Sequence, residues 1–330
     1  MKYIRTIASK GEDYLTNVQK AFGSAFLYAI ITGFALMIVK VALNYAGVID
    51  VLAHRFTLSF IVASLLLLVN KQKMKVNRHD VLRILPLGLL FPICYFGFQA
   101  LGLLYTTSSE ASIIQASVPI FTLLLATYLL KETSTPRQKF SILLSVSGIV
   151  YILAMKGVNF SVSGSIGALF ILLAALSNAS YNVLARKLTR SYSTSELTYV
   201  MMFVGFIGFN GVAVVHHSLN GSLATFFKPL FQLGFLLSVA YLGIFSSLIT
   251  AFLSNYALKT IQAAQMSVFT NLATLIGVVA GVAFLHEHLS YFHWIGGLAI
   301  MIGIIGTTYQ ERSRAQKLSK KLIDKKLENS

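Results

Sequence analysis

Acidic residues are scarce in this chain of 330 residues, which has only 11 Asp and Glu residues against 27 Lys and Arg residues. All charged residues together make up 12% of the positions, whereas a typical soluble domain has about 25%. Hydrophobic residues make up 56%. This composition excludes an ordinary soluble domain and favours a protein that resides in a lipid bilayer.

Several chemical motifs are also missing. Cys94 is the single cysteine, so no internal disulfide can form. The chain has no phosphate-binding loop of the form GxxxxGK[ST], and we therefore expect no ATP hydrolysis. It has neither a DDxxD-like acidic cluster nor an HxxxxD pair, which a lipid-processing membrane enzyme would need. His286, Glu287 and His288 form too sparse a pattern for a metal site, so we predict no enzyme activity, no metal and no cofactor.

What the chain does have is long runs without Asp, Glu, Lys or Arg. A spanning helix takes about 20 apolar residues. We predict an all-α membrane protein with ten transmembrane helices. They cover about 22–43, 51–69, 82–104, 109–130 and 137–155 in the first half, and 164–185, 195–215, 230–256, 262–285 and 290–309 in the second.

The net charge of +16 would suggest nucleic acid binding in a soluble protein, but its placement suggests a membrane topology. With the N-terminus inside, the predicted outer loops carry only Lys156 and Lys228, while most other basic residues fall in inner segments. This positive-inside bias predicts a multi-pass protein of the cell membrane with both termini in the cytoplasm. We expect the lipid bilayer and a small-molecule substrate as partners, and no nucleic acid.

An internal repeat organises the chain. At a fixed offset of 155, residues 108–136 match residues 263–291, pairing Ser112 with Ser267, and Glu132 with Glu287. We therefore predict two five-helix repeats. Because five is odd, the second copy enters the membrane from the opposite side, which places a solute site between the halves at mid-membrane. The predicted segments are a cytoplasmic lead (1–20), a first repeat (21–155), a second repeat (164–309) and a basic cytoplasmic tail (310–330).

These features resemble the EamA family of the drug/metabolite transporter superfamily. The resemblance covers residues 20 to 310 and is carried by the ten-helix count, the repeat, and motifs that include LAHRFTLS and VAFLHEHLS. Residues that match the family pattern are Gly33, Lys40, Arg55, Pro119 and Glu132. The chain departs from that pattern at Thr32, which replaces a Trp, at Lys131, which replaces a Gly, and at Thr274, which replaces a Pro. The resemblance implies a transporter without implying a particular substrate.

Two permanent charges fall within predicted helices, Lys40 and Arg55. Charges inside a membrane usually face a cavity or a partner. We predict that both contribute to the substrate pathway, with two alternatives left open. Lys40 could extend to the outer surface or pair with Asp50, and Arg55 could belong to a structural ion pair. Glu132 and Glu287 end two apolar helices, and for both we predict a structural role.

Polar side chains near the middle of the helices are the other pathway candidates. We select Gln99, Asn178, Tyr181 and Asn271, although hydrogen bonding between helices is an equally open role for them. The functional prediction is a secondary transporter that exports amino acids, small metabolites or drugs by alternating access. The alternative is a flippase of lipids or lipid-linked sugars. A pathway with Arg and amides but no acid would suit substrates that bear a carboxylate.

Overall fold

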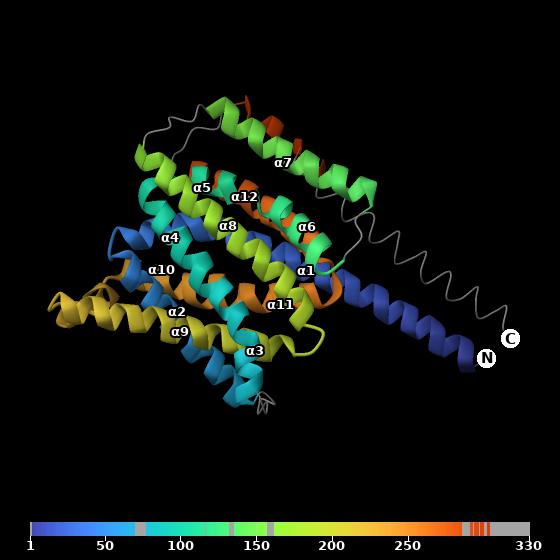
Figure 1. The fold of residues 1–330 in the computed structure, drawn as a ribbon, viewed down its shortest axis with the longest axis horizontal. Helices are drawn as coiled ribbons and strands as arrows, with labels where there is room; N and C mark the ends of the chain where they lie inside the picture. The colour runs from blue at the N-terminus through green and yellow to red at the C-terminus, as the bar shows by residue number, and fades with distance from the viewer. Residues whose placement is uncertain are drawn as a thin grey trace.

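The computed structural model is all-helical over the residues it describes, which are 2–69, 77–115, 117–131, 135–156, 162–285 and parts of 291–303 (Figure 1). The first half contains α1 (Lys2–Leu43), α2 (Val48–Val69), α3 (Arg78–Gly88), η1 (Leu89–Cys94), α4 (Tyr95–Tyr105), α5 (Ser108–Gln115), α6 (Val118–Leu129) and α7 (Pro136–Lys156). The second contains α8 (Val162–Leu188), α9 (Thr194–Leu219), η2 (Leu223–Thr225), η3 (Lys228–Phe231), α10 (Leu233–Ala240), η4 (Tyr241–Ile249), α11 (Thr250–Thr260) and α12 (Ala263–Leu285).

Seven of the described helical segments are long and apolar enough to cross a membrane. They are Thr16–Leu43, Val48–Val69, Arg78–Tyr105, Ile166–Leu188, Thr194–Leu219, Leu233–Thr260 and Ala263–Phe284. Two shorter apolar helices, Val118–Leu130 and Lys139–Gly148, accompany them. The protein is therefore a multi-pass membrane protein. The tenth predicted helix, 290–309, lies largely outside the described residues.

The predicted helix 109–130 is wrong as a single helix, because α5 ends at Gln115 and α6 begins at Val118. Pro119 explains the interruption. Its ring nitrogen carries no N–H to donate to the carbonyl four residues earlier. The chain instead restarts at Ser117, whose carbonyl accepts from the N–H groups of Ile120 and Phe121.

Two of the described helix starts follow ordinary capping rules. Asn77 caps α3 by accepting from the Asp80 N–H at 2.9 Å, and the Asp80 carboxylate accepts from the Asn77 N–H in return. Ser193 and Glu196 form the same reciprocal pair at the start of α9. Such reciprocal pairs, called capping boxes, satisfy backbone donors that a helix start leaves free. Short polar turns therefore suffice to begin these long apolar helices.

The offset of 155 recurs in the structure. The segment α3–η1–α4, called helix 78–105 below, maps onto the segment α10–η4–α11, called helix 233–260, with the same start and end. Both contain a π-helical turn in the middle, where the chain winds more widely than in an α-helix. Both end in an extended residue, Thr106 and Ile261.

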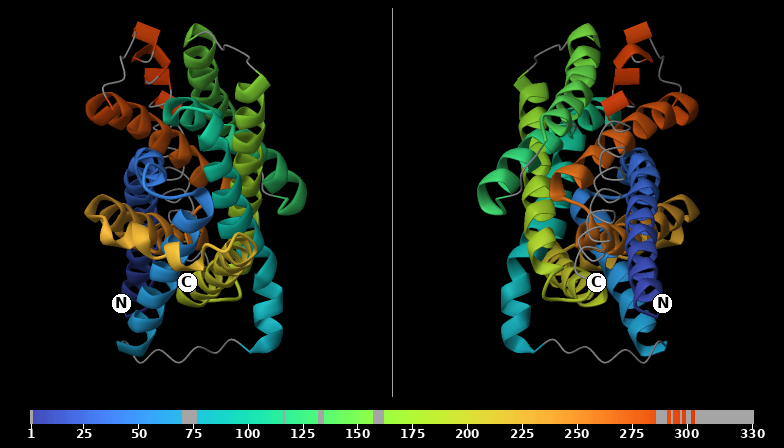
Figure 2. Two further views of the ribbon diagram at one scale, coloured as in Figure 1. Left: turned by 90° about the vertical axis from the view of Figure 1, so that its left-hand side faces the viewer. Right: turned by 90° about the vertical axis from the view of Figure 1, so that its right-hand side faces the viewer.

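The two halves interleave rather than lying side by side. Helix 78–105 packs on α8 and α9 of the second half, whereas helix 233–260 packs on α1 and α2 of the first (Figures 1 and 2). Close approach depends on matched glycines. A Cβ at Gly88 would lie 2.9 Å from the Val204 Cβ, and one at Gly243 would lie 2.8 Å from the backbone oxygen of Arg55. Small residues are the usual means of helix contact in lipid.

Candidate functional site

A polar cavity lies where the interleaved helices meet. Its walls come from α1, helix 78–105, α5, helix 233–260 and α12. Its lining residues are Tyr28, Thr32, Ala35, Leu36, Phe91, Tyr95, Phe96, Gln99, Ser112, Gln115, Ser246, Thr250, Thr270, Ala273 and Thr274. The cavity volume is about 20 Å³, enough for about one water molecule. In this conformation, a larger solute would need the walls to move apart.

One wall of the cavity carries a hydrogen-bonded chain. The Gln99 amide donates to the Tyr95 hydroxyl at 2.9 Å, and that hydroxyl donates to the Gln115 side-chain oxygen at 3.2 Å. All three side chains are buried. The Gln115 amide nitrogen has no partner among the described residues, so this chain ends in a free donor at the cavity.

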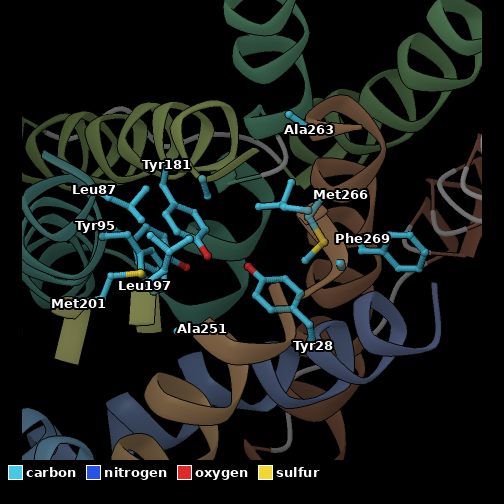
Figure 3. Close-up of a cluster of buried hydrophobic side chains, with 14 of the residues drawn as sticks. Tyr28, Leu87, Tyr95, Tyr181, Leu197, Met201, Ala251, Ala263, Met266 and Phe269 are labelled. Carbon is cyan, nitrogen blue, oxygen red and sulfur yellow. The ribbon is translucent and has the colours of Figure 1, made fainter. Parts of the chain in front are cut away.

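Tyrosines from different helices converge nearby. Figure 3 shows the Tyr28 hydroxyl of α1 pointing toward that of Tyr181 on α8. The Tyr181 hydroxyl donates to the Asn255 oxygen at 3.0 Å, and the Asn255 amide donates to Thr198 at 3.2 Å. Tyr181 is therefore held by α11 and α9. Unlike Tyr28, it does not line the cavity.

Arg55 is the buried cation of the site, with 1% of its surface exposed. Its Nε donates to the Ser247 Oγ at 2.6 Å, and its Nη2 donates to the Ser246 Oγ at 3.0 Å. Its guanidinium also stacks 3.9 Å from the centre of the Phe96 ring. Cation–π contact and hydroxyls hold the charge in place, and no carboxylate within the described part of the chain pairs with it.

Lys40 lies far along α1 and is half-buried. Where the structure describes the chain, Lys40 makes no ion pair, and it does not line the cavity. The alternative in which Lys40 pairs with Asp50 is not what the described residues show, since Asp50 instead accepts from His217 Nε2 at 2.7 Å. His217 Nδ1 lies 2.7 Å from the Ser222 hydroxyl, so this pair fastens α2 to the turn after α9.

Two predicted pathway amides are buried without partners. Within the described ranges, neither the nitrogen nor the oxygen of the Asn178 and Asn271 side chains has a hydrogen bond. The Tyr28 hydroxyl approaches Asn178 without the geometry of a hydrogen bond. Buried polar groups in proteins are nearly always paired, so such orphans call for an explanation. Neither asparagine lines the cavity.

Of the six predicted pathway residues, the structure places only Gln99 directly in the cavity wall. Arg55 lies behind that wall, because it contacts the lining residues Phe96 and Ser246. Lys40 lies apart. Glu132 and Glu287, predicted to be structural, fall outside the described residues. No cluster of three or more His, Cys, Asp or Glu side chains suited to a metal occurs in the ranges that the structure describes.

Sequence reasoning did not single out Tyr28, Ser246 and Thr250. The repeat offset could have found one of them, because Thr250 is the counterpart of Tyr95, a polar residue inside an apolar run. Ser246 belongs to a pair of serines inside a long apolar run.

A second, larger pocket of about 540 Å³ lies between α2, α9 and helix 233–260. Its lining is mostly apolar, with residues such as Leu66, Tyr199, Leu248 and Phe252. It offers few hydrogen-bond donors or acceptors, so it suits hydrocarbon rather than a polar solute.

Comparisons with known proteins agree with this architecture. The family model described as the EamA-like transporter family matches twice, over residues 19–154 and 165–309. A Bacillus subtilis protein named uncharacterized transporter YcxC is 46% identical over 287 residues, which cover 87% of this chain and 92% of the relative. The WAT1-related protein At3g02690, chloroplastic, of Arabidopsis thaliana is 26% identical over 66% of this chain and 52% of the relative.

A solved crystal structure with 18% identity matches with a TM-score of 0.69, over 89% of this chain and 98% of that chain, which shows likeness of fold alone. The family resemblance predicted from the helix motifs is thereby confirmed by the two family matches and by the Bacillus relative. The chain belongs to the EamA-like transporter family.

Proposed function

We propose that the protein is a secondary transporter that moves a small solute through the central cavity by alternating access. The observation that carries the proposal is the polar cavity itself. It is lined from both halves, and the Gln115 amide nitrogen gives it a free hydrogen-bond donor. Polar groups inside a membrane usually mark a solute path.

The two halves supply the means of alternation. We propose ten transmembrane helices arranged as two inverted five-helix repeats. The matching positions of helix 78–105 and helix 233–260, and their exchange of partners across the halves, support this arrangement. Rocking of one half against the other would open the cavity to each side in turn. The substrate drives this change only through different contacts with the two states.

We place the protein in the cell membrane with both termini in the cytoplasm, on the basis of the positive-inside distribution. The expected direction is export, and the expected substrates are amino acids, small metabolites or drugs. A flippase is not favoured. The matched family is a transporter family, and the central cavity is polar and narrow, which does not suit an acyl chain.

The test is solute uptake into liposomes that contain the purified protein, compared with protein-free liposomes. Gln115→Leu removes the free amide at the cavity and should slow uptake by about tenfold, the equivalent of one hydrogen bond of about 1.4 kcal/mol. Gln265→Leu is the matched control, because Gln265 also has a buried free amide nitrogen but does not line the cavity. Movement of a fluorescent phospholipid without solute uptake would replace the proposal with the flippase alternative.

A further inference from the structure

The guanidinium of Arg55 has spare donors. Its Nε–H and its Nη2 group are taken up by Ser247 and Ser246, whereas Nη1 has no hydrogen bond within the described part of the chain. One nitrogen with two N–H groups therefore remains available. A guanidinium edge of this kind fits the oxygens of a carboxylate or sulfonate.

The charge of Arg55 is also uncompensated. Its hydrogen bonds go to serines, and no carboxylate in the described ranges pairs with it. No lining residue of the cavity is an Asp or a Glu. A buried charge without a counter-ion is costly, so a site that keeps one usually receives the opposite charge from elsewhere.

Arg55 is separated from the cavity by a single layer of side chains. The Phe96 ring, on which it stacks, and the Ser246 hydroxyl, to which it donates, both line the cavity. The free amide nitrogen of Gln115 belongs to the same lining. An anion in the cavity would therefore meet a cation and a neutral donor, whereas an organic cation would be repelled by the charge of Arg55.

We propose that the substrate is a small organic acid of net negative charge, whose carboxylate or a similar anionic group is held in the cavity by Arg55 with Ser246 and Gln115. This inference rests on the proposed function and narrows it to one substrate class. A zwitterion is disfavoured because the described lining offers its ammonium group no acid.

The experiment measures uptake of three probes that share a benzene ring into liposomes that contain the full chain. Benzenesulfonate carries a permanent negative charge, phenyltrimethylammonium a permanent positive charge, and phenylalanine is a zwitterion. The wild type should take up benzenesulfonate at least about tenfold faster than either other probe. Arg55→Gln should lower this uptake to the protein-free rate. Arg83→Gln removes an exposed cation from α3 and should change nothing.

A second variant guards against misfolding of Arg55→Gln. Ser246→Asp places an acid beside Arg55, which should lower benzenesulfonate uptake and raise phenyltrimethylammonium uptake. Ser246→Asn, of the same size, should not raise cation uptake. Each variant is first compared with the wild type by thermal unfolding in detergent.

The outcomes separate the two proposals. If the cation or the zwitterion is taken up as fast as the anion, or if folded Arg55→Gln retains anion uptake, the anion inference is overturned while the transporter function stands. If the wild type takes up none of the three probes, the anion inference is overturned, and labelling of Thr32→Cys in the cavity wall from both sides of the membrane then decides the transporter function separately.

Discussion

Helix 78–105 and helix 233–260 have the same length and the same π-helical interruption, but different residues produce it. In the first, Pro92 cannot donate to the backbone, and Phe91 before it takes extended dihedral angles, with φ −142° and ψ 104°. In the second, no proline is present, and the turn contains Gly243 and the serines 246 and 247. The backbone shape is shared, whereas the chemistry is not.

The difference gives the two interruptions different side chains at the cavity. The first interruption presents the apolar ring of Phe91 to the cavity, while the second presents Ser246 and holds Arg55 through Ser247. The two copies thus share a backbone shape while they diverge at residues that line the cavity. Irregular helical turns are common at functional sites for this reason.

The largest expected effect comes from the matched glycines. Gly243→Ala should reduce the free energy of unfolding by about 3 kcal/mol, because the new Cβ meets the backbone oxygen of Arg55. Gly88→Ala meets the side chain of Val204 instead and should cost about 1–2 kcal/mol. Denaturation by sodium dodecyl sulfate in mixed micelles measures both. If Gly88→Ala loses more stability than Gly243→Ala, the expected order of the two variants is wrong.

A smaller loss of stability is expected from removing a hydrogen-bonded amide, and none from removing an amide without a partner. Asn255, on helix 233–260, accepts from Tyr181 and donates to Thr198, so Asn255→Leu should cost about 2 kcal/mol of stability. Asn271→Leu removes an amide that has no partner within the described ranges, and the free energy of unfolding should stay the same or rise. Solute uptake by the Asn271→Leu variant should nevertheless fall. If Asn271→Leu unfolds as readily as Asn255→Leu, the amide is structural.

Ser247→Ala should cost about 1–2 kcal/mol, because it leaves the Nε–H of Arg55 without an acceptor. Ser64→Ala is the control, since that hydroxyl only bonds to a carbonyl one turn earlier in its own helix. The same unfolding assay applies. Equal stability of the two variants would show that Ser247 does not hold the guanidinium.

Pro92→Ala should have the smallest effect, with a change in the free energy of unfolding below about 1 kcal/mol. Alanine restores a backbone donor and relaxes the restriction on Phe91, while Gly88 and the neighbouring packing keep the wide turn in place. Unfolding of this variant, compared with the wild type, is the measurement. A loss as large as that of Gly243→Ala would mean that the proline itself maintains the first interruption.

The sequence allowed the membrane class, most helix ranges and the register of the repeat to be predicted, because apolar runs and small inter-helix residues are local signals. It did not predict the break at Pro119 or the π-helical turns, which depend on how each interrupted helix packs on others. Arg55 was recognised from its charge alone. Its serine partners lie about 190 residues away in the chain, at sequence separations of 191 and 192, and no local pattern joins them.

The same reasoning explains the misplaced residues. Lys40 and Tyr181 were selected as polar groups inside apolar helices, but the side to which such a residue turns depends on its neighbours. Tyr181 turns to Asn255, and Lys40 remains half-buried away from the cavity. Periodicity within one helix cannot distinguish a helix face that lines the cavity from a face that packs on another helix.

The most direct test of the account is chemical access to the cavity from each side of the membrane. In a Cys94→Ser background, which removes the single native thiol, Thr32→Cys places a thiol in the cavity wall, and Leu124→Cys places one on an exposed apolar position as control. Labelling with a membrane-impermeant maleimide is measured in right-side-out and in inside-out vesicles. We predict labelling of Thr32→Cys in both orientations and of Leu124→Cys in neither. Labelling of Thr32→Cys in only one orientation, with or without solute, would contradict alternating access through this cavity.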